Sequence, residues 1–166
     1  MKKDRMLIPV VTLLLMLFAL CASSAWAADG VSPASVAKKF AKAYYMLDES
    51  MGDYLSQDAL GSEDEVNMVE LYLDQKEYAA LSQGYKLSYF KMQPLGMKAN
   101  VLSQDDKSAT VEITTTNVRS INPLYRIVGF VFSLMDQHEV KEVITLVQED
   151  GEWKVGPGAL DLPAPI

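Results

Sequence analysis

Cysteine and histidine are almost absent from this chain of 166 residues, which contains one of each, Cys21 and His138. A single cysteine excludes an intramolecular disulfide and any metal site built from several thiolates. A single histidine excludes every site that needs a histidine pair. His138 stands between acidic residues with too few nearby ligands for a metal ion. We therefore expect an exposed histidine, no metal and no cofactor.

Positive charge is also scarce. The chain has 15 lysines and arginines against 22 aspartates and glutamates, a formal net charge of -7. Binding to a nucleic-acid backbone needs clustered basic side chains, so we expect no nucleic-acid partner. The sequence also lacks a glycine-rich phosphate loop and a nucleophile elbow. With 49% apolar residues, the length is suited to one domain with its own core.

The N-terminal residues have the pattern of an export signal. A short basic stretch over residues 1–5 precedes an uncharged, largely apolar run that extends to residue 28. The run ends in Ala25-Trp26-Ala27, a small-x-small cleavage pattern. We predict a signal peptide over 1–27 and export through the inner membrane to the periplasm or the medium. An uncleaved N-terminal membrane anchor is the alternative, because the run is just long enough to span a bilayer.

Cleavage would leave 12 basic and 21 acidic residues, because Lys2, Lys3, Arg5 and Asp4 are removed. The mature chain would then carry a net charge of -9 and no cysteine, so its core alone must hold it together. We expect a lead-in over 28–32, a domain over 33–157 and a tail rich in proline and glycine over 158–166.

Two amphipathic helices are predicted in the first half of the domain. Ser32 and Pro33 form an N-cap and first helical position. The apolar stripe that follows extends as far as Gly52, which is expected to break the helix, and consists of Val36, Phe40, Tyr44, Leu47 and Met51. A second helix is predicted over 63–83, with a capping box at Ser62 and Glu65 and a C-terminal Gly84.

The period then changes to two, which predicts antiparallel strands. One long strand is expected over 85–101, bent or bulged near Pro94 and Gly96. A second is expected over 109–116. The last two, over 140–148 and 153–155, are joined by a tight turn at Asp150-Gly151. Because apolar residues alternate on both faces of the 140–148 strand, we expect it to be covered on both sides.

Residues 121–135 fit no simple pattern. The segment contains one charge, Arg126, and is apolar on every face. Asn122-Pro123 could start a helix, whereas the β-branched and aromatic residues suit a strand, and periodicity does not decide between them. The segment is either part of the core or an apolar lid, dimer face or membrane-touching element.

The order of helices and strands, closed by Leu146-Val147-Gln148-Glu149-Asp150-Gly151-Glu152-Trp153-Lys154-Val155, resembles the nuclear transport factor 2-like superfamily. The opening helix around Val36-Ala37-Lys38-Lys39-Phe40 is similar to that of the family as well. The resemblance implies an α+β fold, in which N-terminal helices pack in a curved antiparallel sheet of about four strands, the cystatin-like cone. It also implies an apolar pocket inside the cone. Family members include both enzymes and binding proteins, so the fold does not fix the function.

Asp48 and Tyr44 lie four residues apart and provide the one weak catalytic alternative. In a small isomerase or cyclase, a cavity aspartate with a raised pKa could act as a base while a tyrosine donates a hydrogen bond. The residues expected to line a pocket or bind a partner are Phe40, Tyr44, Tyr89, Ile113, Tyr125, Phe130, Phe132 and Trp153.

The excess of apolar residues without reactive groups favours an exported, non-catalytic domain. We expect it to bind a small apolar ligand or a protein partner through the cone and residues 121–135. The partner could be a second copy, since Thr110, Glu112 and Thr114 form a mixed sheet face, or another envelope protein. Contact with a membrane surface is a further alternative, which the negative charge of the mature chain disfavours for anionic lipid.

Overall fold

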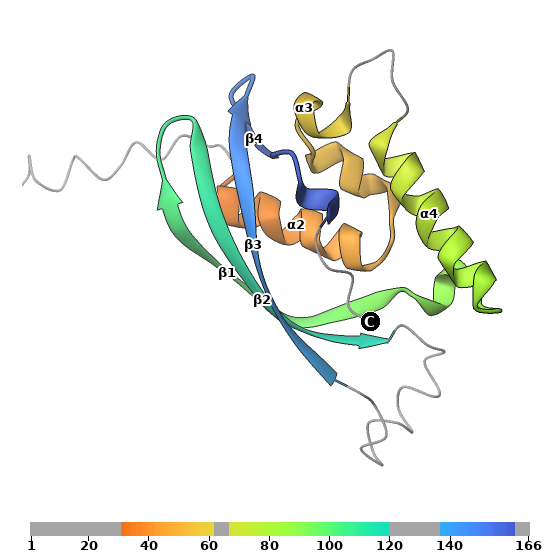
Figure 1. Ribbon diagram of the computed structural model, residues 1–166. Coiled ribbons are helices and arrows are strands. Elements are labelled where there is room, and N and C mark those ends of the chain that lie inside the picture. The colour runs from red at the N-terminus through yellow and green to blue at the C-terminus, as the bar shows by residue number, and fades with distance from the viewer. Residues whose placement is uncertain (1–30, 62–66, 120–136, 162–166) are drawn as a thin grey trace, which may run out of the picture. The chain divides into compact units, whose positions relative to one another are not determined.

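The computed structural model describes residues 31–61, 67–119 and 137–161. The chain divides into two units, residues 1–30 and 31–166, and all described residues belong to the second. Within them, helices come first and an antiparallel sheet follows, so the predicted α+β class is confirmed (Figure 1). The predicted signal peptide, the 121–135 segment and most of the predicted C-terminal tail lie outside the described residues.

The first helix, α2 (Pro33–Tyr45), begins as its sequence predicts. The Ser32 side chain accepts a hydrogen bond from the amide of Ser35 at 3.3 Å, and proline occupies the first helical position. Phe40 and Tyr44 are buried on the apolar stripe. The three lysines of the helix are exposed on the other side, and they are Lys38, Lys39 and Lys42.

The stripe does not continue as helix to Gly52, so that part of the prediction was wrong. Leu47 adopts a left-handed backbone conformation with φ 48° and ends α2. Its amide and that of Asp48 bond back to the carbonyls of Tyr44 and Ala43 at 3.1 and 3.0 Å, which is the Schellman pattern. Met51 remains fully buried, but in the 3₁₀ helix η2 (Glu49–Tyr54). An apolar stripe predicts which side chains are buried, but it does not predict where the helix ends.

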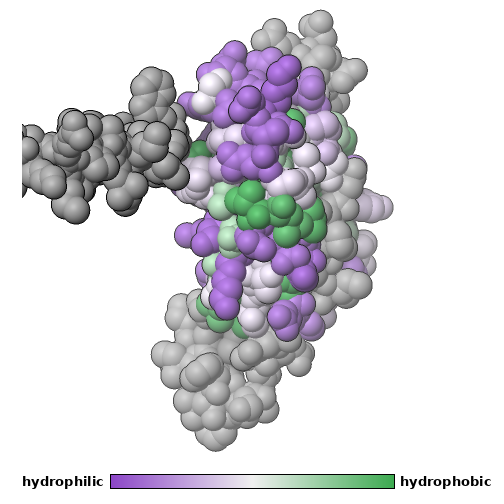
Figure 2. All heavy atoms as spheres, turned by 90° about the vertical axis from the view of Figure 1, so that its left-hand side faces the viewer, coloured by the Kyte–Doolittle hydropathy of each residue, from purple (hydrophilic) through white to green (hydrophobic). Residues whose placement is uncertain are grey.

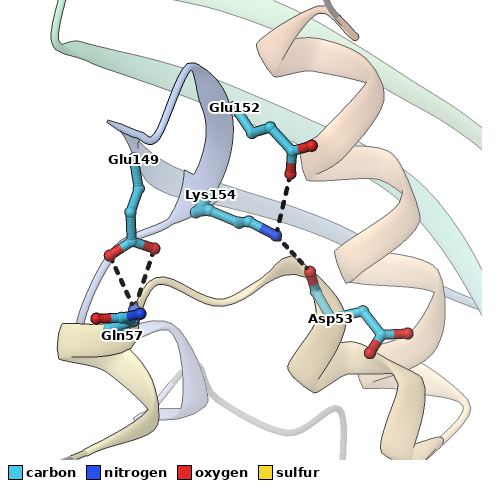
Figure 3. Close-up of polar contacts among 5 residues, drawn as sticks. All are labelled: Asp53, Gln57, Glu149, Glu152 and Lys154. Carbon is cyan, nitrogen blue, oxygen red and sulfur yellow. Dashed lines mark hydrogen bonds and ion pairs between the residues drawn. The ribbon is translucent and has the colours of Figure 1, made fainter.

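The end of the sheet holds η2 and the short helix α3 (Gln57–Leu60) in place (Figure 3). Both carboxylate oxygens of Glu149 accept from the amide of Gln57 at 3.2 Å, at the start of α3. Lys154 Nζ donates to the carbonyl oxygen of Asp53 at 3.0 Å and lies 3.4 Å from a carboxylate oxygen of Glu152. These contacts tie the two short helices to the hairpin that contains Glu149 and Lys154.

That helix, α4 (Met68–Ser82), starts later than predicted. Asn67 is its N-cap, and its side-chain oxygen accepts from the amides of Val69 and Glu70 at 3.0 and 3.4 Å. A continuous helix over 63–83 is therefore wrong, while Ser62 and Glu65 lie outside the described residues. The C-terminus agrees with the prediction, because Gly84 has φ 78° just after the C-cap.

Residues 85–91 are not part of a strand, which corrects the prediction from their alternating pattern. Instead, Leu87–Tyr89 forms the 3₁₀ helix η3, and the rings of Tyr85 and Tyr89 stack with their centroids 4.2 Å apart. Residues four apart can meet in a helical turn, whereas on a strand they lie on the same face but about 13 Å apart. The apparent alternation therefore came from an aromatic pair in a turn.

Four strands of the described residues form one antiparallel sheet in the order β1-β2-β3-β4. They are β1 (Met92–Gln104), β2 (Ser108–Arg119), β3 (Gln137–Glu149) and β4 (Glu152–Val155). The predicted bulge is confirmed, because the register between β1 and β2 shifts between Leu95 and Lys98, around Gly96 with φ 62°. The predicted tight turn is confirmed too, since Asp150 and Gly151 have φ 51° and 84°.

One face of the sheet packs against α2 and carries the core. On β2, Ala109, Val111 and Ile113 are buried on this inner face. On β3, Ile144 and Leu146 are buried there as well.

The outer face of the sheet is largely polar. Glu112 and Lys141 form an ion pair on it at 2.9 Å. Figure 2 views this side and shows mainly hydrophilic residues around a smaller hydrophobic patch. Val143 is 50% exposed on β3, so the expectation that this strand is covered on both sides was wrong.

Candidate functional site

Five polar or aromatic side chains gather where the end of α2 meets the inner face of the sheet. We call them the inner polar cluster, and they are Tyr44, Tyr45, Tyr72, Asn117 and Glu142, all buried. They come from α2, α4, β2 and β3. Polar groups in a core are stable only when hydrogen-bonded, so the partner of each group decides what the cluster can do.

Glu142 provides the carboxyl group of the cluster. It lies on the inner face of β3, and its Oε2 accepts a hydrogen bond from the Tyr45 hydroxyl at 2.7 Å. Its Oε1 has no hydrogen-bond partner. Burial raises the pKa of Glu142, against the lowering effect of the Tyr45 hydrogen bond. Burial, followed by the hydrogen bond to Glu142, likewise raises the pKa of Tyr45 far above its usual value.

Asn117 is fully buried near the end of β2. Its side chain approaches the Tyr45 hydroxyl closely enough to lower the pKa of that group, yet neither Oδ1 nor Nδ2 completes a hydrogen bond. The other two buried polar side chains of the described residues are satisfied. Thr115 donates to the carbonyl oxygen of Leu95 at 3.1 Å, and Ser56 accepts from the amide of Ala59 at 3.2 Å. Among the described residues, Asn117 and Glu142 are therefore the buried polar side chains with atoms that make no hydrogen bond.

Tyrosines enclose the cluster on the helical side. The ring of Tyr44 lies 5.4 Å from that of Tyr72 and 5.7 Å from that of Tyr45. Burial, with a hydrogen bond to Tyr72 next, raises the pKa of Tyr44 well above its usual range. Burial also raises the pKa of Tyr72. The tyrosines therefore remain protonated and act as neutral hydrogen-bonding groups.

A second feature is the outward side of α4. Val69, Tyr72 and Ala80 bury one face of the helix. The opposite face carries exposed apolar residues among polar ones, and we call three of them the α4 outer stripe: Leu71, Tyr78 and Leu81. Tyr78 is 76% exposed and Leu81 is 62% exposed. Figure 1 shows α4 on the far side of α2 from the sheet.

Aromatic residues continue from the C-terminal end of α4. Tyr85 and Tyr89 stack with an interplanar angle of 7° and remain partly exposed. The guanidinium of Arg119, at the end of β2, lies 4.2 Å from the centroid of the Tyr89 ring. Tyrosine and arginine in this arrangement are typical of energetically important interface residues.

The predicted site residues do not converge on one place. Phe40, Tyr44 and Ile113 are buried core residues, and Phe40 stacks on Tyr44 at 5.8 Å. Trp153 is partly buried against the same core. Tyr89 lies in η3, 37% exposed. The remaining predicted residues lie outside the described residues, and they are Tyr125, Phe130 and Phe132.

The weak catalytic alternative is not supported at Asp48. This side chain is exposed and caps η2, where its Oδ1 accepts from the Ser50 amide at 2.9 Å. Hydrogen bonding to Ser50 lowers the pKa of Asp48, whereas a base of the proposed type needs a raised pKa. The cause is local, because aspartate before a helical turn satisfies free backbone amides.

Sequence reasoning missed Glu142 and Asn117, although a signal was present. Both occupy inward positions on strands in which buried and exposed residues alternate. Glu142 lies two residues before Ile144 on β3, and Asn117 lies four residues after Ile113 on β2. A polar residue in phase with a buried apolar series is the informative exception. The outer stripe was missed because only the buried face of α4 was read as apolar.

Neither a search of protein-family models nor a search of curated proteins finds a match to this chain. Among the described residues, no group of acidic, histidine or cysteine side chains could hold a metal ion. None of the helices described is long and apolar enough to cross a membrane. His138 is exposed, as its sequence context predicts.

Proposed function

We propose that this chain is an exported, non-catalytic binding domain that engages a protein partner through the α4 outer stripe. The observation that carries the proposal is that α4 presents apolar residues on two opposite faces, one buried and one exposed. Exposed apolar side chains gathered on one helix face are typical of an interaction surface.

A carboxylate beside the stripe, that of Asp74, favours a protein partner over a lipid surface. Asp74 lies three residues after Leu71 and four before Tyr78, so it falls between them on the same side of the helix. Inserting this side of α4 into a bilayer would bury that carboxylate, at a high cost in free energy. A protein partner can instead place a basic side chain opposite Asp74. The acidic composition of the whole chain is consistent with a partner of this kind.

A pair of aromatic residues follows α4 in the chain. The amide of Tyr85 bonds back to the carbonyl of Ala80 at 2.9 Å, and the stacking of Tyr85 on Tyr89 fixes both rings in advance. Rings that are already ordered lose little side-chain entropy when a partner covers them. Arg119 beside Tyr89 adds a cation that can pair with a carboxylate of the partner.

Site-specific photocrosslinking in cells that make the protein tests this proposal. A photoreactive phenylalanine analogue replaces Tyr78, and a matched control places the same analogue at Thr145, which is exposed on β3. We expect a discrete crosslinked protein species from position 78 and none from position 145. Changing both Leu71 and Leu81 to aspartate should abolish that species.

Crosslinking only to lipid, equal crosslinking from both positions, or a species that survives the double aspartate variant would each contradict the proposal. A crosslinked product of twice the chain's mass would identify the partner as a second copy.

A further inference from the structure

Together with Asp74, the α4 outer stripe has the spacing of heptad positions a and d. Successive members are three, four and three positions apart, and they are Leu71, Asp74, Tyr78 and Leu81. All of these side chains are exposed. The buried or half-buried side chains of the helix occupy the b, c and f positions, and they are Val69, Tyr72, Leu73, Lys76, Ala79 and Ala80. The exposed members therefore form one narrow seam along the helix, opposite the side that contacts the core.

The exposed side of α4 is acidic. Glu70 and Glu77 are exposed and lie seven positions apart, so both border the seam on the same side, and Asp74 lies within it. The one lysine of the helix belongs to the other side, because the Nζ of Lys76 lies 5.1 Å from the centroid of the buried Tyr72 ring. Within this helix, the seam therefore has carboxylates around it and no cation.

This distribution of charge does not suit a second copy of the chain. Pairing two α4 helices through the seam would bring the carboxylates of one copy against those of the other. Like charges brought together across an interface oppose binding, whereas opposite charges steer partners together and fix their alignment. The seam therefore favours a different protein, one that places lysine or arginine side chains opposite the carboxylates.

The shape of the seam favours a helix as the contacting element. A seam of a and d positions is narrow and follows the helix axis, and a second helix can pack along it at a small crossing angle. On the side away from Glu70 and Glu77, the seam is bordered by Gln75 and Ser82, which are exposed and polar. A broad apolar surface would remove these groups from water at a cost in free energy, whereas a helix would leave them hydrated.

We infer that the partner presents to α4 an amphipathic helix with lysine or arginine beside its apolar face. The inference rests on the proposed function, because it names the kind of partner that the α4 outer stripe takes. Apolar side chains of that helix pack on the stripe, and its basic side chains lie opposite Asp74, Glu70 and Glu77. The apolar contacts supply the buried area, and the charges select the partner and align the two helices.

Mapping crosslinks on the partner tests whether its segment is a helix. A rise of about 1.5 Å per residue places Leu71 and Tyr78 about 10 Å apart along α4. The photoreactive phenylalanine analogue replaces each residue in turn, and tandem mass spectrometry of the crosslinked product locates the attached residue of the partner. On a helix the two attachment sites should lie about seven residues apart, whereas on an extended strand they should lie about three apart. Lysine or arginine should lie within one helical turn of the sites.

Reversing the charges beside the stripe tests the basic character of the partner. Glu70→Lys together with Glu77→Lys should lower the crosslinking yield from position 78 at least about tenfold, because attraction to basic side chains becomes repulsion. The matched control is Asp106→Lys together with Glu139→Lys. It makes the same change in net charge at exposed positions of the turn before β2 and of β3, and it leaves α4 intact. This control should change the yield by less than about twofold.

Glu77→Lys alone carries the charge test if the double variant loses the circular dichroism of the folded domain, since Glu77 lies beyond the first turn of α4. Attachment sites about three residues apart, sites in separate segments, or a yield that charge reversal leaves unchanged would overturn the inference while the proposed function stands. A crosslinked product of twice the chain's mass would do the same. The absence of any crosslinked protein would instead contradict the proposed function, and the inference with it.

Discussion

The hydroxyl of Tyr45 lies 2.7 Å from Oε2 of Glu142 and joins the last turn of α2 to the middle of β3. These residues are 97 positions apart in the sequence. This is the only hydrogen bond that the Glu142 carboxyl accepts within the described residues, and it crosses the interface between helix and sheet. Its loss should therefore lower the free energy of unfolding of the whole domain.

Replacing Tyr45 with phenylalanine tests this bond. The variant keeps the buried ring but leaves the carboxyl of Glu142 without a donor, so the free energy of unfolding should fall by about 1–3 kcal/mol. Urea denaturation measures the change. Tyr85→Phe is the matched control at an exposed ring and should change stability by less than about 0.5 kcal/mol. An equal loss in both variants would show that the Tyr45 bond contributes nothing specific.

The dependence of stability on pH should reveal the buried carboxyl. Because the pKa of Glu142 is raised in the folded state, the unfolded chain loses this proton first as pH increases. The contribution of Glu142 to the free energy of unfolding is fully present below the ordinary glutamate pKa, and it is lost as pH rises through the pKa of Glu142 in the folded state. Tyr44, Tyr45 and Tyr72 face Glu142, and all stay protonated over this range because their own pKa values are raised.

Glu142→Gln cannot ionise, so its stability relative to the wild type should increase over the pH range from the ordinary glutamate pKa upward through the raised pKa of folded Glu142. Parallel urea titrations across that range measure the difference. Asp48 and Asp105, whose pKa values are lowered by hydrogen bonds, have the opposite dependence, but they are common to both proteins and cancel. A difference that stays constant with pH would mean that Glu142 ionises equally in both states.

The left-handed conformation of Leu47 predicts an unusual order of stability. Both Leu47→Ala and Leu47→Gly lose the buried side chain, but only glycine relieves the strain at φ 48°. The glycine variant should therefore be more stable than the alanine variant by about 1 kcal/mol. At Lys42 inside α2 the same pair should show the usual order, with glycine less stable by roughly 0.5–1 kcal/mol. Thermal denaturation of the four variants measures both differences. If the alanine variant were more stable than the glycine variant at both positions, backbone strain at Leu47 would be refuted.

The start of α4 gives a further test. Asn67→Ala removes the side chain that accepts from the amides of Val69 and Glu70, and it should cost about 1 kcal/mol. Asn67→Asp keeps an acceptor and should retain most of the stability. Both values are measurable by urea denaturation. If Asn67→Ala were neutral, the capping role of this residue would be wrong.

Much of the fold could be predicted because local patterns agreed with the packing. Ser32-Pro33 starts α2, Asp150-Gly151 turns the last hairpin, and Gly96 marks the bulge in β1. Each signal rests on the backbone requirements of one or two residues, and no tertiary contact opposes it.

The errors arose where a periodic pattern had two explanations. Tyr85 and Tyr89 alternate with polar residues, yet they form a stacked pair in a turn. The candidate site was harder to predict than the fold, because Tyr45 and Glu142 meet only after helix and sheet have packed. No local pattern links positions so far apart in the sequence.

Native mass spectrometry of the protein isolated from the cells that make it tests the central claim most directly. The wild-type chain should be observed together with a protein partner at a fixed ratio. A variant with Tyr78→Asp and Leu81→Asp should be observed alone while its circular dichroism remains that of the folded domain. A wild-type chain found alone, or a complex of the same mass in both proteins, would contradict the claim that the α4 outer stripe binds a protein.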